Sequence, residues 1–126
     1  MIIFRILLGT KNTGDSSYPG NRDYYYADSF VIDIIDTFLA TSGQLVDALY
    51  SSLVESDVET FTRAAHTLKS NSAIFGARHL LNLCKELETA GKSNNLTGSL
   101  FPLVEQLKIE YKQVCRELAD LRKSMG

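Results

Sequence analysis

From Ser29 onward, apolar residues recur every three or four positions, which is the spacing of one face of an α-helix. The first such segment covers residues 29–55, and three more are predicted to begin near Ser56, near Ala77 and between Leu96 and Phe101. Short loops separate the four amphipathic segments. The pattern therefore predicts an all-α fold, an antiparallel up-down-up-down four-helix bundle. The apolar positions of the first segment are Phe30, Ile34, Ile35, Phe38, Leu45, Leu49 and Leu53.

Local signals suggest where the later helices begin and end. Ser56 and Glu59 fit a capping box, in which each side chain bonds the backbone amide of the other residue. Gly76 is expected to end that helix, because glycine readily adopts the left-handed conformation of a closing residue. Residues 91–95 are expected to form the next loop, and Pro102 is tolerated in the first turn of the last helix.

The first 28 residues differ from the rest in composition. Residues 9–28 are rich in Gly, Ser, Asn, Asp and Tyr, and Tyr18-Pro19-Gly20 is a turn signal. We predict an N-terminal arm or linker at 1–28, with room for a short ordered element in its apolar start. The bundle is predicted at 29–122, followed by a C-terminal tail at 123–126.

Composition and charge narrow the function classes. Apolar residues make up 44% of the 126, and the net charge of −2 does not favour a nucleic-acid partner. The two cysteines, Cys84 and Cys115, form no CxxC pair and are expected to be reduced thiols. No apolar run approaches the roughly 20 residues that cross a bilayer, and the apolar start does not match a signal peptide. We expect a cytoplasmic domain without membrane contact.

Candidate chemistry lies on the second helix. On a helical wheel, His66 falls opposite the apolar stripe and is therefore predicted to face solvent. Arg63 and Lys69 lie within side-chain reach of it. This arrangement leaves the imidazole open to an approaching surface. The stripe consists of Phe61, Leu68, Ser72 and Phe75, and the small neighbours of His66 are Thr62, Ser70 and Ala73.

An exposed imidazole beside cations suits phosphoryl transfer. Neutral imidazole is a nucleophile near neutral pH, and a cation such as Lys69, or secondarily Arg63, offsets the charge of the phosphoryl group. The sequence has no GxxxxGK[ST] or GxGxxG loop, so the donor must bring an activated phosphoryl group. His79 lacks a comparable clearing of small residues and is interpreted as a surface residue. Its spacing from His66 does not match a metal-ligand pair.

The stretch from Ala65 to Ala77, with His66, Lys69 and Gly76, resembles the signature of histidine-containing phosphotransfer domains. Residues 80–88 resemble the next helix of that family, and the likeness covers about residues 29–122. The resemblance implies a four-helix bundle in which His66 accepts phosphoryl from a receiver-domain aspartate and passes it to another receiver. It also implies that Lys69 supports the phosphoryl group. The docking face is then expected to include Thr62, Arg63, Thr67 and Ala73.

The same resemblance implies the partners and the cofactors. The partners are response-regulator receiver domains and a hybrid sensor histidine kinase, and the domain itself is expected to be a monomer. It is not expected to be an enzyme with its own nucleotide site or to hold a cofactor, and Mg²⁺ is expected on the receiver. Ser70 departs from the family pattern, which usually has Gly there, and its hydroxyl could bond the imidazole or the phosphoryl oxygens.

Two other functions compete with the relay. The first is a helical interaction module in which His66 is incidental. The second is a histidine-kinase dimerisation domain, which also carries a phosphoacceptor histidine on a helix. That class normally has an acidic residue directly after the histidine and a proline downstream, whereas Thr67 and Leu68 follow His66 here. Nucleotide and metal motifs of a complete kinase or phosphatase are absent from the sequence.

Overall fold

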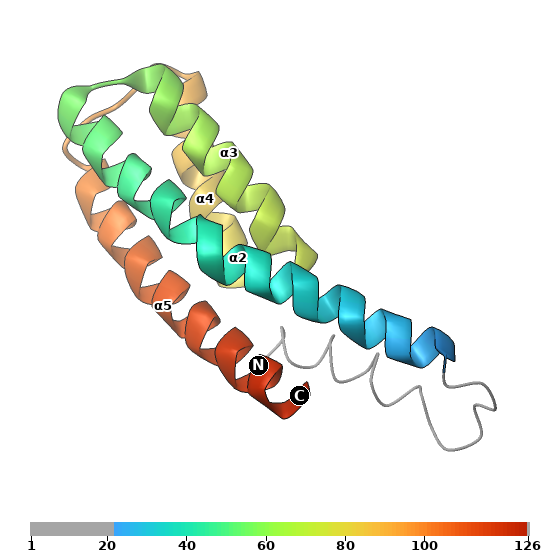
Figure 1. Ribbon diagram of the computed structural model, residues 1–126. Coiled ribbons are helices and arrows are strands. Elements are labelled where there is room, and N and C mark those ends of the chain that lie inside the picture. The colour runs from blue at the N-terminus through green and yellow to red at the C-terminus, as the bar shows by residue number, and fades with distance from the viewer. Residues whose placement is uncertain (1–21, 126) are drawn as a thin grey trace.

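The computed structural model describes residues 22–125, with side chains from Ser29 onward. This part of the chain forms four helices, and the prediction of an all-α four-helix bundle is confirmed (Figure 1). Short connections reverse the chain direction after each helix. Both α2 and α4 pack against α3 and α5, which closes the bundle. The helices are α2 at Arg22–Glu55, α3 at Val58–Ile74, α4 at Arg78–Lys92 and α5 at Leu100–Met125.

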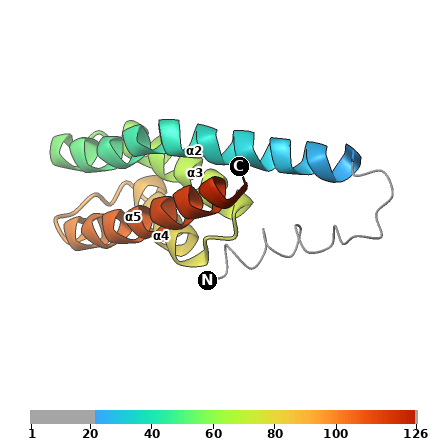
Figure 2. The same cartoon turned by 60° about the horizontal axis from the view of Figure 1, so that its bottom comes forward.

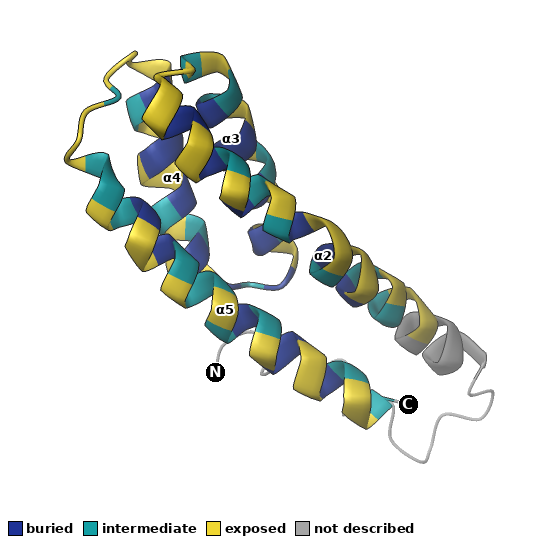
Figure 3. Cartoon of the chain, turned by 60° about the vertical axis from the view of Figure 1, so that its left-hand side comes forward, coloured by how far each residue is buried: buried dark blue, intermediate teal, exposed yellow. Residues whose placement is uncertain are grey.

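Every helix contributes to one continuous apolar core. Buried residues follow a single stripe along each helix, while the opposite faces are exposed (Figure 3). The phenylalanine rings of Phe38 on α2 and Phe75 after α3 meet edge to face, with their centroids 5.3 Å apart. The largest buried side chains are Phe61, Phe75, Ile35, Leu49, Leu68, Leu80, Leu87, Leu107 and Leu118.

Helix α2 begins at Arg22, seven residues before the predicted start, so it takes in the end of the predicted arm. Residues 1–21 lie outside the described part of the chain. After the turn signal at Tyr18-Pro19-Gly20 there is no further Pro or Gly before Gly43, so nothing in the sequence breaks the helix earlier. Figures 1 and 2 show α2 extending past the ends of α3 and α4.

By length and composition alone, the Ser29–Glu55 part of α2 could cross a membrane, with a mean hydropathy of 1.3 over its most apolar window. This differs from the expectation that no apolar run is long enough to cross a bilayer. Within this helix Ile35, Phe38 and Leu49 lie in the core of the bundle, although only 22% of the apolar window is buried. The same helix carries exposed carboxylates, such as those of Asp33 and Asp36, on its other face.

The turn between α2 and α3 differs by one residue from the prediction. The N-cap is Asp57 rather than Ser56, and its carboxylate accepts from the Thr60 amide at 3.2 Å and from the Thr60 hydroxyl at 2.7 Å. These bonds lower the pKa of Asp57. Ser56 instead occupies the turn with a φ of 57°, so its hydroxyl does not cap the helix and the predicted capping box with Glu59 does not form.

Two glycines mark the ends of α3 and α4. Gly76 follows α3 with a φ of 67°, which confirms its role as the left-handed closing residue. Gly91, however, lies inside α4 rather than in the predicted loop. A Cβ atom at Gly91 would stand 2.1 Å from Oγ1 of Thr62 and 3.2 Å from its Cα. Gly91 therefore allows α4 to approach α3 closely, next to the candidate site.

Candidate functional site

His66 lies in the middle of α3 and its side chain is 59% exposed, which confirms the predicted solvent-facing position. Its surroundings follow from the helical period. Ser70 and Ala73, one and two turns later, are also exposed, and Thr62 is half-buried one turn earlier. The predicted buried face is confirmed for Phe61, Leu68, Ser72 and Phe75. The fold thus holds α3 by its apolar side and presents the imidazole outward.

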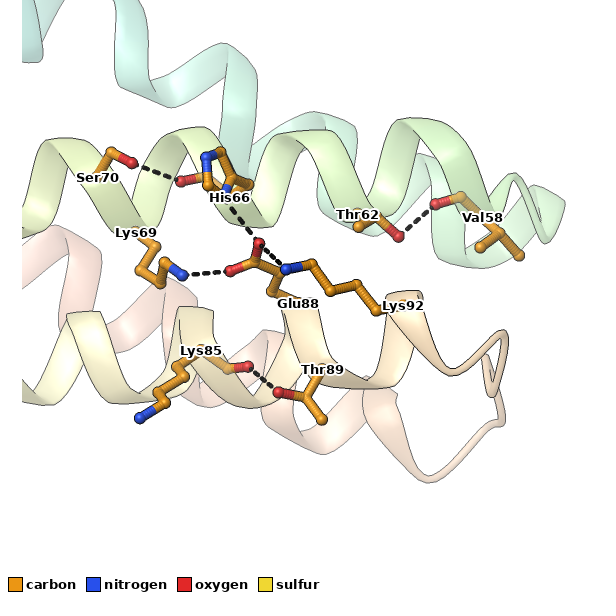
Figure 4. A network of polar contacts seen from close by, with 9 residues as sticks. All are labelled: Val58, Thr62, His66, Lys69, Ser70, Lys85, Glu88, Thr89 and Lys92. Atoms are coloured by element: carbon orange, nitrogen blue, oxygen red, sulfur yellow. Dashed lines mark hydrogen bonds and ion pairs between the residues drawn. The ribbon is translucent and has the colours of Figure 1, made fainter.

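The imidazole contacts a buried carboxylate that the sequence analysis did not identify. Nδ1 of His66 lies 2.7 Å from Oε2 of Glu88, which belongs to α4 (Figure 4). Glu88 is only 4% exposed. Its other oxygen, Oε1, lies 2.6 Å from the ammonium of Lys69, and Oε2 also lies 3.3 Å from that of Lys92. One carboxylate therefore joins three groups from two helices.

These contacts keep Glu88 ionised. The ammonium of Lys69 is the main cause, followed by the bonds from His66 and Lys92, and together they lower the pKa of Glu88 to about 2 despite its burial. Burial alone would favour the neutral acid, because a carboxylate loses hydration in the interior. Partners within hydrogen-bond distance reverse that preference. At neutral pH the residue beside His66 is therefore an anion.

The anion decides which imidazole nitrogen carries the proton and which carries the lone pair. An ionised carboxylate only accepts hydrogen bonds. The N–H group at Nδ1 of His66 must therefore donate the hydrogen bond to Glu88, and the proton stays on the ring. In the neutral ring, the lone pair then lies on Nε2. Figure 4 shows Glu88 on one side of the ring, between the two lysines. The site therefore combines a fixed tautomer with an exposed imidazole.

The other predicted site residues have definite partners. Lys69 is half-buried and paired with Glu88, so its ammonium does not extend freely into solvent. The hydroxyl of Ser70 donates to the backbone carbonyl of His66 at 3.2 Å and not to the imidazole. Arg63 pairs with Glu59 of the same helix at 2.9 Å, and both side chains are exposed.

Two recesses flank the exposed face of α3. The first has a volume of about 500 Å³ and adjoins His66 on the α4 side, and the second has a volume of about 240 Å³ and lies between α2 and the end of α3. Ile74, in the second, is 56% exposed. The first is lined by Glu59, Thr62, Arg63, His66, Glu88 and Lys92. The second is lined by Asp33, Ile34, Thr37, Phe38, Thr41, Asn71, Ile74 and Phe75.

Comparison with known proteins agrees with this geometry. The sequence profile of the Hpt domain matches residues 33–123. The chain belongs to the Hpt domain family. The matched range contains every residue predicted for the site. The chain is also 30% identical over 95 residues to histidine-containing phosphotransfer protein 5 of Arabidopsis thaliana, which is 73% of this chain and 60% of that protein. It therefore spans about three fifths of the length of this curated relative.

A solved structure has the same fold as this Hpt domain. The crystal structure of histidine-containing phosphotransfer protein B from Pseudomonas aeruginosa PAO1 superposes with a TM-score of 0.70 at 24% identity. The match covers 87% of this chain and 98% of that one, so the bundle is shared over nearly its whole length.

The other histidine and the two cysteines agree with the expectations for a surface histidine and for free thiols. His79 is exposed near the start of α4. Cys84 and Cys115 are free thiols, and burial raises the pKa of Cys84 to about 12. A thiol with so high a pKa is not a nucleophile near neutral pH. His66 is therefore the better candidate for nucleophilic chemistry.

Proposed function

We propose that this Hpt domain is a phosphorelay intermediate in two-component signalling. His66 accepts a phosphoryl group from the aspartate of one receiver domain and passes it to another. The observation that carries the proposal is the exposed imidazole of His66, whose Nδ1 is bonded to the buried carboxylate of Glu88 at 2.7 Å. In the neutral ring, that bond leaves the lone pair on Nε2, the nitrogen that would attack phosphorus.

The transfer step follows from that tautomer. The lone pair of Nε2 on His66 attacks the phosphorus of the aspartyl phosphate, and an N–P bond forms. The bond from phosphorus to the aspartate oxygen breaks, and the carboxylate leaves with the electron pair. Nδ1 keeps its proton, so the ring gains positive charge, which the anion of Glu88 offsets. Transfer to the second receiver reverses these events.

Lys69 acts mainly through Glu88 in this scheme. It holds Oε1 at 2.6 Å and so keeps the carboxylate charged and fixed under the imidazole. Its positive charge also lies close to the bound phosphoryl group, as the family resemblance implies. Ser70 keeps the space beside the ring open, because its small side chain bonds back to the His66 carbonyl.

The partner completes the chemistry. The domain is a phosphoryl carrier without its own nucleotide site or cofactor, and the receiver supplies the phosphorylated aspartate together with Mg²⁺. A hybrid sensor histidine kinase stands upstream in the relay. We place the domain in the cytoplasm as a monomer, because receiver domains must reach its exposed α3 face.

The groove between α2 and α3 is the proposed docking surface for the receiver. It lies on the same helix as His66 and continues toward the end of α3 through Asn71 and the exposed Ile74. An apolar recess on the helix that carries His66 is suited to hold a partner while transfer occurs. The expected docking residues Thr62, Arg63, Thr67 and Ala73 lie on the same helix, and Arg63 and Ala73 are exposed.

A transfer assay tests this function. A panel of isolated receiver domains is phosphorylated with a small acyl phosphate and mixed with wild type, His66→Gln or His79→Gln. We expect acid-labile, base-stable phosphate on wild type and His79→Gln and none on His66→Gln. Both histidines are exposed, so His79→Gln is a matched control. Equal labelling of His66→Gln and wild type would contradict the role of His66, whereas no labelling of any variant by the whole panel would favour an interaction module in which His66 is incidental.

A further inference from the structure

The two lysines that contact Glu88 differ in how firmly they are held. Lys69 is 29% exposed and its ammonium lies 2.6 Å from Oε1, whereas the other two contacts of Glu88 are made by Oε2. Lys92 is 67% exposed and its ammonium lies 3.3 Å from Oε2, an oxygen that His66 also contacts. Charged N–H···O contacts are usually about 2.7–2.9 Å long, so the Lys92 contact is a loose one.

The balance of charges also indicates that Lys92 is held less firmly than Lys69. Lys69 neutralises the buried anion of Glu88, and Arg63 is paired with Glu59 on α3. The charge of Lys92 is then left without an equal counter-charge in this cluster. A phosphoryl group on His66 would bring about two negative charges to the same place, and nearby cations stabilise such charge. Of the two lysines on Glu88, Lys92 has the longer contact, at 3.3 Å, and the more exposed side chain, so its contact is the one that costs less to give up.

The position of Lys92 would allow it to leave Glu88 and contact a phosphoryl group on His66. Lys92 is the last residue of α4 and lines the same recess of about 500 Å³ as His66. Figure 4 shows its ammonium meeting Glu88 from the side opposite Lys69, at the oxygen nearest the imidazole. If Lys92 turned away, Glu88 would still be held by Lys69 and His66. The buried carboxylate would therefore not be left without partners.

We propose that Lys92 is a second phosphoryl-binding cation of the site, which exchanges its contact with Glu88 for the phosphoryl oxygens on His66. The inference rests on the proposed function of His66. In the transfer step Lys92 forms and breaks no covalent bond. It offsets charge on the phosphoryl oxygens while the N–P bond forms, and Lys69 keeps Glu88 in place.

The test uses potassium phosphoramidate, a small donor that phosphorylates histidine without a receiver. Labelling of His66 is followed by mass spectrometry at one fixed pH of about 8.5, above the ordinary pKa of about 6.5 for a histidine side chain. We expect Lys92→Gln to be labelled about fivefold more slowly than wild type, the effect of one exposed charge contact. Lys92→Arg should keep most of the rate, because it keeps the charge.

Lys85→Gln is the matched control. Lys85 is exposed on the same helix, and Figure 4 shows its ammonium pointing away from Glu88. We expect it to react at the wild-type rate, and thermal melts should show all variants folded. Equal rates for Lys92→Gln and wild type, or equal slowing in Lys85→Gln, would overturn the role of Lys92. Failure of wild type to be labelled at His66 would contradict the proposed function itself, so the two failures are distinguishable.

Discussion

Glu88 is the residue on which the geometry of the site depends. Its carboxylate is buried, yet it contacts two ammonium groups and one imidazole. A buried anion with such partners is stable, whereas the loss of its charge would leave the partly buried Lys69 without a counter-ion. The same carboxylate orients His66. We therefore expect the side chain of Glu88 to affect both the stability of the fold and the reactivity of His66.

Substitution of Glu88 by Gln should affect both properties. The neutral amide keeps the shape but removes the anion, so we expect slower labelling of His66 and a loss of about 1–2 kcal/mol in the free energy of unfolding at neutral pH. Urea denaturation measures the second effect. Glu86→Gln, an exposed residue of the same helix, is the control. A Glu88→Gln variant as stable and as reactive as wild type would contradict this role.

The stability that Glu88 contributes should depend on pH with a definite sign. Its pKa is about 2 in the folded protein, below the ordinary value of 4.5. The folded state therefore favours the anion, and the contribution is complete above about pH 4.5 and is lost as the pH falls toward 2. The difference in unfolding free energy between wild type and Glu88→Gln should shrink over this range. A difference that is constant from neutral pH to pH 2 would contradict the assignment.

The helical period predicted the exposure of His66 but not its contact with Glu88. The exposure of His66 follows from one helix alone, and the structure confirms it. Glu88 lies on another helix, and which residues meet there depends on the rotation of α4 against α3. A signal was present, because Glu88 follows Leu87 and lies one turn after the buried Cys84. A charged residue at a buried position of a helix is almost always paired.

At the scale of elements, the distance between α3 and α4 determines whether the site forms. Two residues of the predicted 91–95 loop, Gly91 and Lys92, instead belong to the last turn of α4, and residues 93–95 lie in the connection. A glycine near the end of a helical pattern commonly marks its end, which is why the sequence alone suggested a loop. Contact with Thr62 of α3 explains the glycine instead. Sequence signals also misplaced the α3 cap by one residue, because Ser56 and Asp57 are both good caps.

Gly91→Ala should separate the two helices. The new Cβ would meet Oγ1 of Thr62 at 2.1 Å and its backbone Cα at 3.2 Å, so the backbone must shift. Overpacking of this kind costs about 1–3 kcal/mol, against which the better helix propensity of Ala returns up to about 1 kcal/mol. We expect a net loss of stability in urea denaturation and a weaker His66–Glu88 contact. Gly98→Ala is the control, since nothing lies within 4 Å of that Cβ, and equal stability of both variants would contradict the argument.

At the scale of the whole molecule, the bundle leaves one apolar groove open beside the reactive face. Four amphipathic helices were readable from the sequence because each needs one buried stripe. The groove was not, because it arises where α2 and the end of α3 diverge in space. Ile74 is 56% exposed there, although it lies on a helix whose other apolar residues are mostly buried. This exposure is what a partner surface requires.

Ile74→Asp should separate docking from chemistry. A charge in the groove would oppose an apolar receiver surface, so we expect the Kd for a phosphorylatable receiver to rise about tenfold, which corresponds to about 1.4 kcal/mol. Labelling of His66 by phosphoramidate should stay at the wild-type rate, because the small donor needs no docking. Ile109→Asp is the matched control, since Ile109 is 62% exposed on α5, away from the groove. If both variants bind the receiver equally well, the groove is not the docking surface. If Ile74→Asp alone loses binding and keeps chemical labelling, the receiver must approach His66 across α2 and α3.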